Sequence, residues 1–394
     1  MGALRRALGG RCGVRGVGWR SFAPTLTLPR FAGEGISPSP AKRGREGTRE
    51  AGRVGAITVL LITLLTHPAQ SACRTVSVTA DGAPVTGIED MALDAARGHA
   101  VLSAYDRRAG TVGGLYRLNL RSLDAPSVAV TPLATGLRPA GIDLRAEPDG
   151  ARSLLAISRH EDGSATVERY RLDGVTLTHQ GTNAGPLLCR ANDVAFLDGD
   201  RFLFTSSHGG CGWSAVIEDN VLGGRHGFVG LVENNGARVL IGGIGFANGL
   251  FPEPAHDRLT VAATREDALL VYRLSDPQAP PQRIAVPGGP DNLTMAPDGR
   301  LLVALHPSPF RLALHRYGWP GGAAAPTRIA ALGPAGTEIL LDGDGRRFPA
   351  ATVALSWNGR LIIGSVTAPG LLVCDAAANG ATGSSAPAEP PATR

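Results

Sequence analysis

The chain has 394 residues, of which 43% are hydrophobic and 19% charged, a balance that allows a packed core and excludes a wholly disordered protein. Its 53 glycines and 29 prolines argue against a bundle of long helices. Residues 1–72 contain 11 Lys and Arg against 3 Asp and Glu, whereas the remaining chain contains 28 against 31. The net charge of +5 therefore belongs to the N-terminal segment. The mildly acidic body lacks the positive surface of a phosphate-binding protein, and we expect no nucleic-acid partner.

The N-terminal segment has the features of a leader. Residues 1–53 are rich in Arg, Gly, Pro and Ser without periodicity, which predicts disorder or a start codon assigned too far upstream. Residues 54–72 are predicted to be a signal peptide, because a twelve-residue apolar run precedes the small residues Ala69 and Ser71. Such a run is too short to span a bilayer of about 30 Å comfortably. We expect export to the periplasm or the extracellular space, with membrane association only through an uncleaved leader.

Export implies an oxidising compartment, in which cysteines pair. Cys12 lies in the leader, and the four remaining cysteines allow three pairings. They are Cys73, Cys189, Cys211 and Cys374. The first opens the predicted mature chain and the last nearly closes it. Residues 377–394 are predicted to be a disordered tail.

From Gly87 onward, a loose unit of about fifty residues repeats six times. Each unit has an opening motif, a short strand, a turn and a second apolar strand. Many units close with a third strand, for which the candidates are GLYRLNL, VERYRL, LLVYRL and LALHRY. Turns such as Asp149-Gly150 and Asn358-Gly359 favour the positive φ angles of tight hairpins.

Six units of short antiparallel strands predict an all-β fold, a six-bladed β-propeller over residues 73–376. A β-sandwich is the alternative, but it would not repeat one motif six times. A propeller must close its ring, and a Cys73–Cys374 disulfide would do so. Cys189 and Cys211 lie about one hairpin apart, and the sequence leaves their pairing open.

The opening motifs place oxygen-bearing side chains at equivalent positions of the repeat. In a propeller, the innermost strands line one central channel, so these side chains should converge there. They are Glu89, Asp90, Asn192, Asp193, Asn248, Asp291 and Asn292. Asn and Asp are also common in turns for local reasons. Four such motifs at matching positions favour a metal site instead, and an oxygen-only set suits Ca²⁺, which takes six to eight oxygen ligands.

These motifs resemble the paraoxonase/arylesterase family, secreted six-bladed β-propellers with two calcium ions. The resemblance runs from about Cys73 to Asp375 and includes GIEDMAL, RANDVAFL, IGFANGL and GPDNLTM. It implies the same Cys73–Cys374 disulfide. It also implies a catalytic calcium bound by Glu89, Asn192, Asn248, Asp291 and Asn292. A structural calcium would be bound by Asp90, Asp193 and the backbone carbonyl of Ile142.

One position departs from the family pattern. Where the family has a histidine that is thought to help activate water, this chain has Ala140, which cannot accept a proton. The second histidine of the family matches His160, which is therefore the predicted catalytic base. His208 and His306 also fall on predicted blade strands, and either could reach the channel.

The predicted activity is calcium-dependent hydrolysis of a small aryl ester or lactone, with the metal polarising the carbonyl and stabilising the oxyanion. Two alternatives remain open. One is a sugar lactonase similar to SMP-30 and gluconolactonase, with a single metal ion. The other is a non-enzymatic binding propeller, which Ala140 favours. We expect substrate choice to lie in the loops at residues 206–225 and 323–347; the sequence does not predict the oligomeric state.

Overall fold

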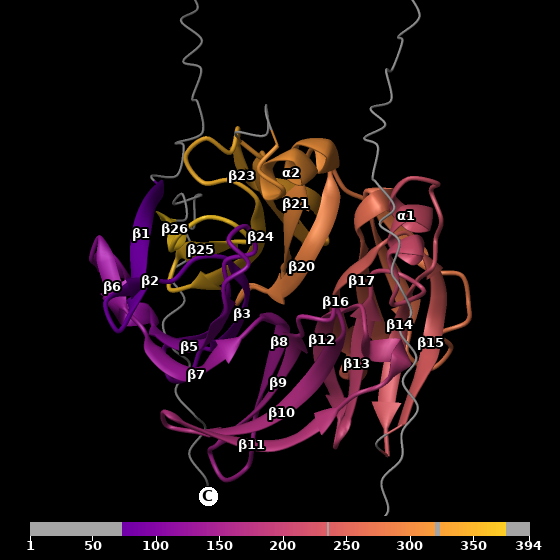
Figure 1. The fold of residues 1–394 in the computed structure, drawn as a ribbon, viewed down its shortest axis with the longest axis horizontal. Coiled ribbons are helices and arrows are strands. Elements are labelled where there is room, and N and C mark those ends of the chain that lie inside the picture. Colours follow the sequence, from indigo (N-terminus) through magenta and orange to yellow (C-terminus); the bar gives the residue numbers. More distant parts are fainter. Residues whose placement is uncertain (1–72, 235, 320–323, 376–394) are drawn as a thin grey trace, which may run out of the picture. The chain divides into compact units, whose positions relative to one another are not determined.

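The computed structural model describes residues 73–375, apart from residues 235 and 320–323. The predicted leader, signal peptide and C-terminal tail lie outside the described residues. The described chain forms six sheets of almost entirely antiparallel strands around a common axis, which confirms the predicted six-bladed β-propeller (Figure 1).

The first five blades each consist of four strands, which follow one another in the chain except that a short strand of another sheet lies between the last two strands of blade 1. Blade 1 contains β3 (Ile88–Asp94), β4 (His99–Ala104), β5 (Gly113–Asn119) and β7 (Thr131–Leu137). Blade 2 contains β8 (Pro139–Ala146), β9 (Arg152–Arg159), β10 (Ala165–Asp173) and β11 (Thr176–Asn183). Blade 3 contains β12 (Ala191–Asp198), β13 (Arg201–Ser206), β14 (Gly227–Glu233) and β15 (Gly236–Ile244).

Blade 4 contains β16 (Ala247–Glu253), β17 (Arg258–Ala263), β18 (Ala268–Arg273) and β19 (Gln282–Ala285). Blade 5 contains β20 (Gly289–Met295), β21 (Leu301–His306), β22 (Thr327–Gly333) and β23 (Gly336–Gly343). Blade 6 combines β24 (Ala351–Trp357), β25 (Arg360–Ser365) and β26 (Leu371–Asp375) with the N-terminal β1 (Cys73–Ala80). The short strands β2 (Ala83–Pro84) and β6 (Ser127–Ala129) extend β1 at the outer edge.

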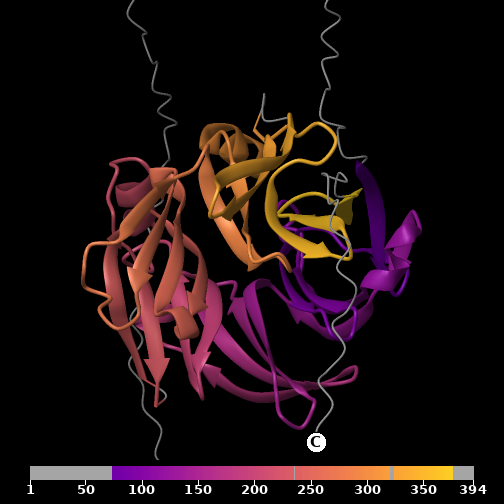
Figure 2. The ribbon, with the colours of Figure 1, turned by 180° about the vertical axis from the view of Figure 1, so that it is seen from behind.

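The ring closes where the two ends of the described chain meet. β1 pairs antiparallel with β26, and Cys73 lies opposite Cys374 in that register. The two cysteines form the predicted disulfide, 301 residues apart in sequence. In both views β1 runs beside the strands of the C-terminal blade (Figures 1 and 2). The last blade is thus built from both ends of the chain, so it cannot form until the ring is complete.

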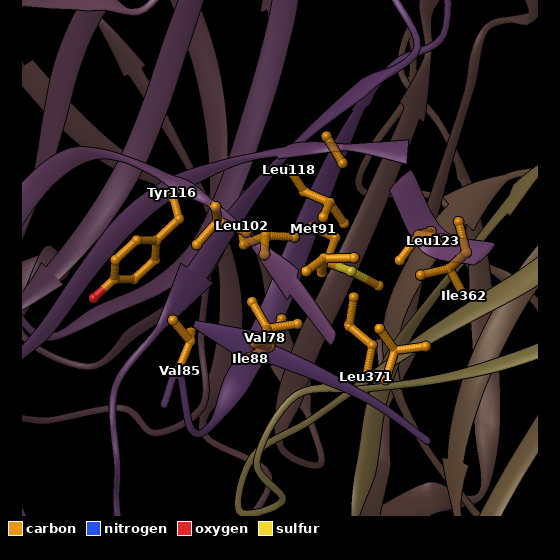
Figure 3. Close-up of a cluster of buried hydrophobic side chains, with 14 of the residues drawn as sticks. Val78, Val85, Ile88, Met91, Leu102, Tyr116, Leu118, Leu123, Ile362 and Leu371 are labelled. Atoms are coloured by element: carbon orange, nitrogen blue, oxygen red, sulfur yellow. The ribbon is translucent and has the colours of Figure 1, made fainter. Parts of the chain in front are cut away.

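Apolar side chains pack between neighbouring blades, because the second strands are buried on both faces. The cluster in Figure 3 joins Val78 of β1 and Leu102 of β4 to Ile362 and Leu371 of the last blade. This cluster reinforces the same closure that the disulfide makes. The other blade interfaces are packed in the same way, for instance by Phe202 and Phe204 between blades 2 and 3.

Two short α-helices interrupt the blades, α1 (Trp213–Asn220) and α2 (Pro309–Arg316). The second corrects an expectation, because the segment LALHRY lies in and just after a helix instead of forming the third strand of blade 5. Ser308 caps this helix by accepting the backbone N–H of Arg311, and Pro309 starts it with a φ already suited to a helix. Among the described residues, no helix is long and apolar enough to cross a membrane.

The expectation of a specificity loop at residues 323–347 is also wrong, since most of this segment forms β22 and β23. The long connection of blade 5 instead runs from residue 307 to residue 326 and carries α2. The other expected loop, residues 206–225, does carry α1. A second disulfide, between Cys189 and Cys211, ties that loop to the segment before β12, and so resolves the pairing that the sequence left open.

Candidate active site

The first strand of every blade is irregular at its start. In each, the pairing with the second strand skips one or two residues, for example between Ala191 and Val194 in β12. The first skipped residue of each blade defines a set that we call the axial ring. Its members are Glu89, Ala140, Asn192, Asn248, Asp291 and Thr352. A bulge frees side chains from the regular alternation of a strand, which lets this ring present oxygen ligands together.

Hydrogen bonds to the Glu89 carbonyl show that the starts of the first strands converge. The Asn292 amide of blade 5 donates to the Glu89 carbonyl of blade 1 over 3.0 Å, and the Thr352 hydroxyl of blade 6 donates to the same oxygen. Blades 1 and 5 are not neighbours, so the first of these bonds reaches past blade 6. All of these side chains are buried. The structure therefore brings together residues that are more than 200 positions apart in the sequence.

The three asparagines are held with their oxygens free to bind a ligand. The Asn192 amide nitrogen donates to Ser207 Oγ over 2.8 Å, and that of Asn248 donates to Thr264 Oγ1 over 3.1 Å. The Asn292 amide nitrogen donates to the backbone carbonyl of Glu89. Because each nitrogen has its partner, the amide oxygen is the group left for a cation.

Two acceptor atoms of the ring, Glu89 Oε2 and Asn248 Oδ1, are buried without a hydrogen-bond partner. Leaving such an atom unpaired costs about 1–3 kcal/mol, and a bound cation would remove that cost. Burial also raises the pKa of Glu89, although the Arg107 guanidinium acts in the opposite direction. The residues present thus fit a calcium ion. Within residues 73–375 as described, no three His, Cys, Asp or Glu side chains gather as a metal site, and the candidate set combines carboxylates with amide oxygens.

A second group of carboxylates lies one residue after the axial ring, in the first strands of blades 1 and 3. Asp90 accepts the backbone N–H groups of Met91 and Ile142, and Asp193 accepts those of Val194 and Leu250, all at 2.8 Å. Each carboxylate therefore links its own strand to the first strand of the following blade. Burial raises the pKa of both carboxyls, and the charge of Asp90 adds to the shift at Asp193.

The predicted structural calcium ligands also lie together. A Cβ at Gly141 would lie 2.4 Å from Asp193 Oδ1, so only glycine allows β8 to approach Asp193 this closely. Ile142, the next residue, is bonded to Asp90. Asp90, Ile142 and Asp193 also line one cavity of about 380 Å³. Their role as ligands of a structural calcium stays a prediction.

Sequence reasoning missed Asp143, which repeats the same arrangement. Its carboxylate accepts the N–H groups of Leu144 and Phe196, both at 2.8 Å, and so links blade 2 to blade 3. Burial raises the pKa of Asp143 to about 6. The sequence feature that could have indicated Asp143 is its position in the opening motif of blade 2, where a single acidic residue interrupts an apolar run.

The three candidate histidines have different surroundings. His160 is exposed in the turn after β9, with Nε2 2.9 Å from Thr166 Oγ1, and its predicted catalytic role stays a prediction. His306 is buried, with Nε2 2.7 Å from Asp291 Oδ2 of the axial ring. His208 is buried and contacts Asp219 of α1 at 2.8 Å. Ala140 is fully buried in the apolar cluster between blades 2 and 3.

Arg107 is a second residue that the sequence analysis missed. Its guanidinium lies 3.1 Å from Glu89 Oε1 and 4.8 Å from the centre of the Tyr105 ring. Arg107 lies just after β4, and the end of β4 pairs with the start of β3. A residue just after the second strand of a repeat is therefore close to the opening motif, and this position could have indicated Arg107. One carboxylate oxygen of Glu89 therefore forms an ion pair with Arg107, and the other has no hydrogen-bond partner.

Comparisons with solved structures gave distant similarities. A gluconolactonase from Xanthomonas campestris is 16% identical, with 78% of this chain and 90% of that chain covered and a TM-score of 0.48. A calcium-binding regucalcin from Agrobacterium tumefaciens is 14% identical, with 76% and 95% covered and a TM-score of 0.43. A luciferin-regenerating enzyme is 13% identical, with 77% and 95% covered and a TM-score of 0.49. With TM-scores below 0.5, these similarities carry no argument about function.

A comparison with curated proteins found no match. Among family models, the one described as Arylesterase matches residues 120–375, well over half of the chain. This match includes five of the six members of the axial ring, and the family name indicates a hydrolase. The chain belongs to the arylesterase family.

Proposed function

We propose that the protein is a calcium-dependent hydrolase of lactones or aryl esters, with the axial ring as its active site. The observation that carries this proposal is the pair of unpaired buried acceptors, Glu89 Oε2 and Asn248 Oδ1, within an oxygen-only set. Membership of the arylesterase family supports the reaction class.

Glu89, Asn192, Asn248, Asp291 and Asn292 would hold the catalytic ion, which when bound acts as a Lewis acid toward a substrate carbonyl. The amide nitrogens are already bonded, so the oxygens need little reorganisation, and such fixed geometry favours the charge that develops during acyl transfer. Asp291 also contacts His306 Nε2, and this hydrogen bond would fix the orientation of the carboxylate. Asp90, Asp193 and the Ile142 carbonyl would hold the second, structural ion.

The test is a metal and activity assay on the purified protein. We expect two calcium ions per chain by elemental analysis, and hydrolysis of phenyl acetate and γ-lactones that EGTA abolishes and added calcium restores. One metal ion per chain with a preference for sugar lactones would favour the alternative sugar lactonase. Calcium bound to a folded protein that hydrolyses no ester or lactone would favour a binding propeller.

We also propose that the protein is exported. Both disulfides are of the kind that forms in oxidising compartments, and they support this location. Amino-terminal sequencing of the secreted protein should find Ala72 or Cys73 as the first residue. Secreted material that begins before residue 54 would contradict cleavage at the predicted site.

A further inference from the structure

Three arginines from distant parts of the chain gather beside Glu89, and we call them the arginine cluster. Arg107 follows β4, Arg159 ends β9 and Arg316 ends α2. Their charges act on one another: after burial, the Arg107 charge is the main cause that lowers the pKa of Arg159, and Arg316 acts in the same direction. β4 and β9 both end at the face where the axial ring opens, since their partner strands β3 and β8 begin there.

Among the described residues, only one of the three arginines of this cluster has an ion-pair partner. The Arg107 side chain is only 6% exposed, and Glu89 is its ion-pair partner. Among the described residues, no carboxylate lies within ion-pair distance of Arg159 or Arg316. In addition, Arg107 Nε and Arg159 Nε are buried without a hydrogen-bond partner. Buried donors of this kind are costly unless a ligand satisfies them.

Several other arginines of the described chain are paired with carboxylates. Arg258 makes two hydrogen bonds to Glu253, Arg283 binds Glu266, and Arg328 binds Asp342 through two nitrogens. These pairs lie at the surface, where water could have replaced the partner. Arg159 and Arg316 lack such a carboxylate partner, and at Arg159 the buried Nε makes this lack costly.

We propose that the arginine cluster binds a carboxylate of the substrate, so that the protein acts on lactones or esters that carry a negative charge near the acyl group. Guanidinium groups suit this role, because their planar fork of N–H donors matches a carboxylate. This inference rests on the proposed hydrolase function, since it assigns a substrate class to the same site.

Glu89 connects the two parts of the site. One of its oxygens contacts Arg107 and the other is an unpaired acceptor of the axial ring. A substrate carboxylate beside Arg107 and Arg159 therefore leaves an acyl group of the same small molecule next to the ring. A cation in the ring would add to the positive charge and strengthen the preference for an anionic substrate.

The test compares two lactones of the same shape, 5-oxotetrahydrofuran-2-carboxylate and its neutral carboxamide. Water adds to the lactone carbonyl and the ring C–O bond breaks, so the charged substrate gives 2-hydroxyglutarate. We expect kcat/KM to favour the carboxylate by about 10- to 100-fold in the wild type, the range for hydrogen bonds to a charged group. Arg159→Gln should bring this ratio close to one, because it should lower kcat/KM for the carboxylate far more than for the carboxamide, whereas Arg159→Lys should retain part of the preference.

Arg138→Gln is the matched control. Arg138 lies directly before β8 and is paired with Glu161 at 3.1 Å, so its removal takes away one positive charge of the same blade without affecting the cluster. The ratio should stay at the wild-type value. If Arg159→Gln does not fold, Arg316→Gln offers the same test at a solvent-exposed position. An unchanged ratio in a folded cluster variant would overturn the proposal.

A binding experiment separates this proposal from the proposed function. Glutarate should raise the melting temperature of the calcium-loaded wild type, glutaramide should not, and Arg159→Gln should abolish the glutarate effect. If glutarate binds in this way but no lactone is hydrolysed, the anion site stands and the hydrolase proposal fails. If both lactones are hydrolysed equally and glutarate has no effect, the anion site is wrong and the hydrolase proposal stands.

Discussion

Replacing both Cys73 and Cys374 with serine should lower the free energy of unfolding by about 5–6 kcal/mol, the chain-entropy value for so long a loop. The two cysteines are 301 residues apart, so the bond restricts nearly the whole unfolded domain. The native ring should still form, because β1 remains paired with β26 and Val78 remains packed in the closing cluster. Urea denaturation of the double variant and the wild type measures the difference.

The Cys189–Cys211 disulfide provides the control for this experiment. It spans 22 residues, and the same model assigns about 3 kcal/mol to a loop of that size. The double serine variant at these positions should therefore lose clearly less stability. A larger loss from this pair than from Cys73–Cys374 would contradict the role of the longer loop in closing the ring.

Asp193→Ala should destabilise the fold by about 2–6 kcal/mol, because it leaves two buried N–H groups, those of Val194 and Leu250, without an acceptor. Asn248→Ala should instead keep the fold and reduce kcat/KM by about a hundredfold or more, as expected when a group that stabilises transition-state charge is lost. Its amide oxygen has no partner in the protein and its nitrogen makes one hydrogen bond, to Thr264, so the variant should lose less stability than Asp193→Ala. Urea denaturation and steady-state kinetics of both variants give the comparison.

Asp143→Ala is the matched control for Asp193→Ala, since Asp143 also accepts two backbone N–H groups but is not a predicted calcium ligand. Both variants should lose comparable stability in EGTA. With calcium present, the wild type and Asp143→Ala should gain stability, whereas Asp193→Ala should gain less. If Asn248→Ala unfolds the protein and Asp193→Ala lowers only activity, the assignment of the two ions is reversed.

The fold and much of the candidate site could be predicted because the information is local and repeated. Each opening motif lies a few residues before an apolar strand, and six repeats of short antiparallel strands have few ways to bury their apolar faces other than a propeller. The Asn358-Gly359 turn follows from local preference in the same way, and both residues have positive φ in the structure. The seven oxygen-bearing residues are buried where the repeat placed them.

What the sequence by itself determined is the propeller, its closure by Cys73 and Cys374, and the residues at the start of the inner strands. The tertiary structure decided which other groups reach those residues. Most of LALHRY is helical because the Ser308 cap and the position of the segment in the long connection of blade 5 override a strand-like pattern. Arg107, Arg159 and Arg316 have no shared motif, and only the closed ring brings them together beside Glu89. Their meeting depends on contacts between distant segments, which no local pattern records.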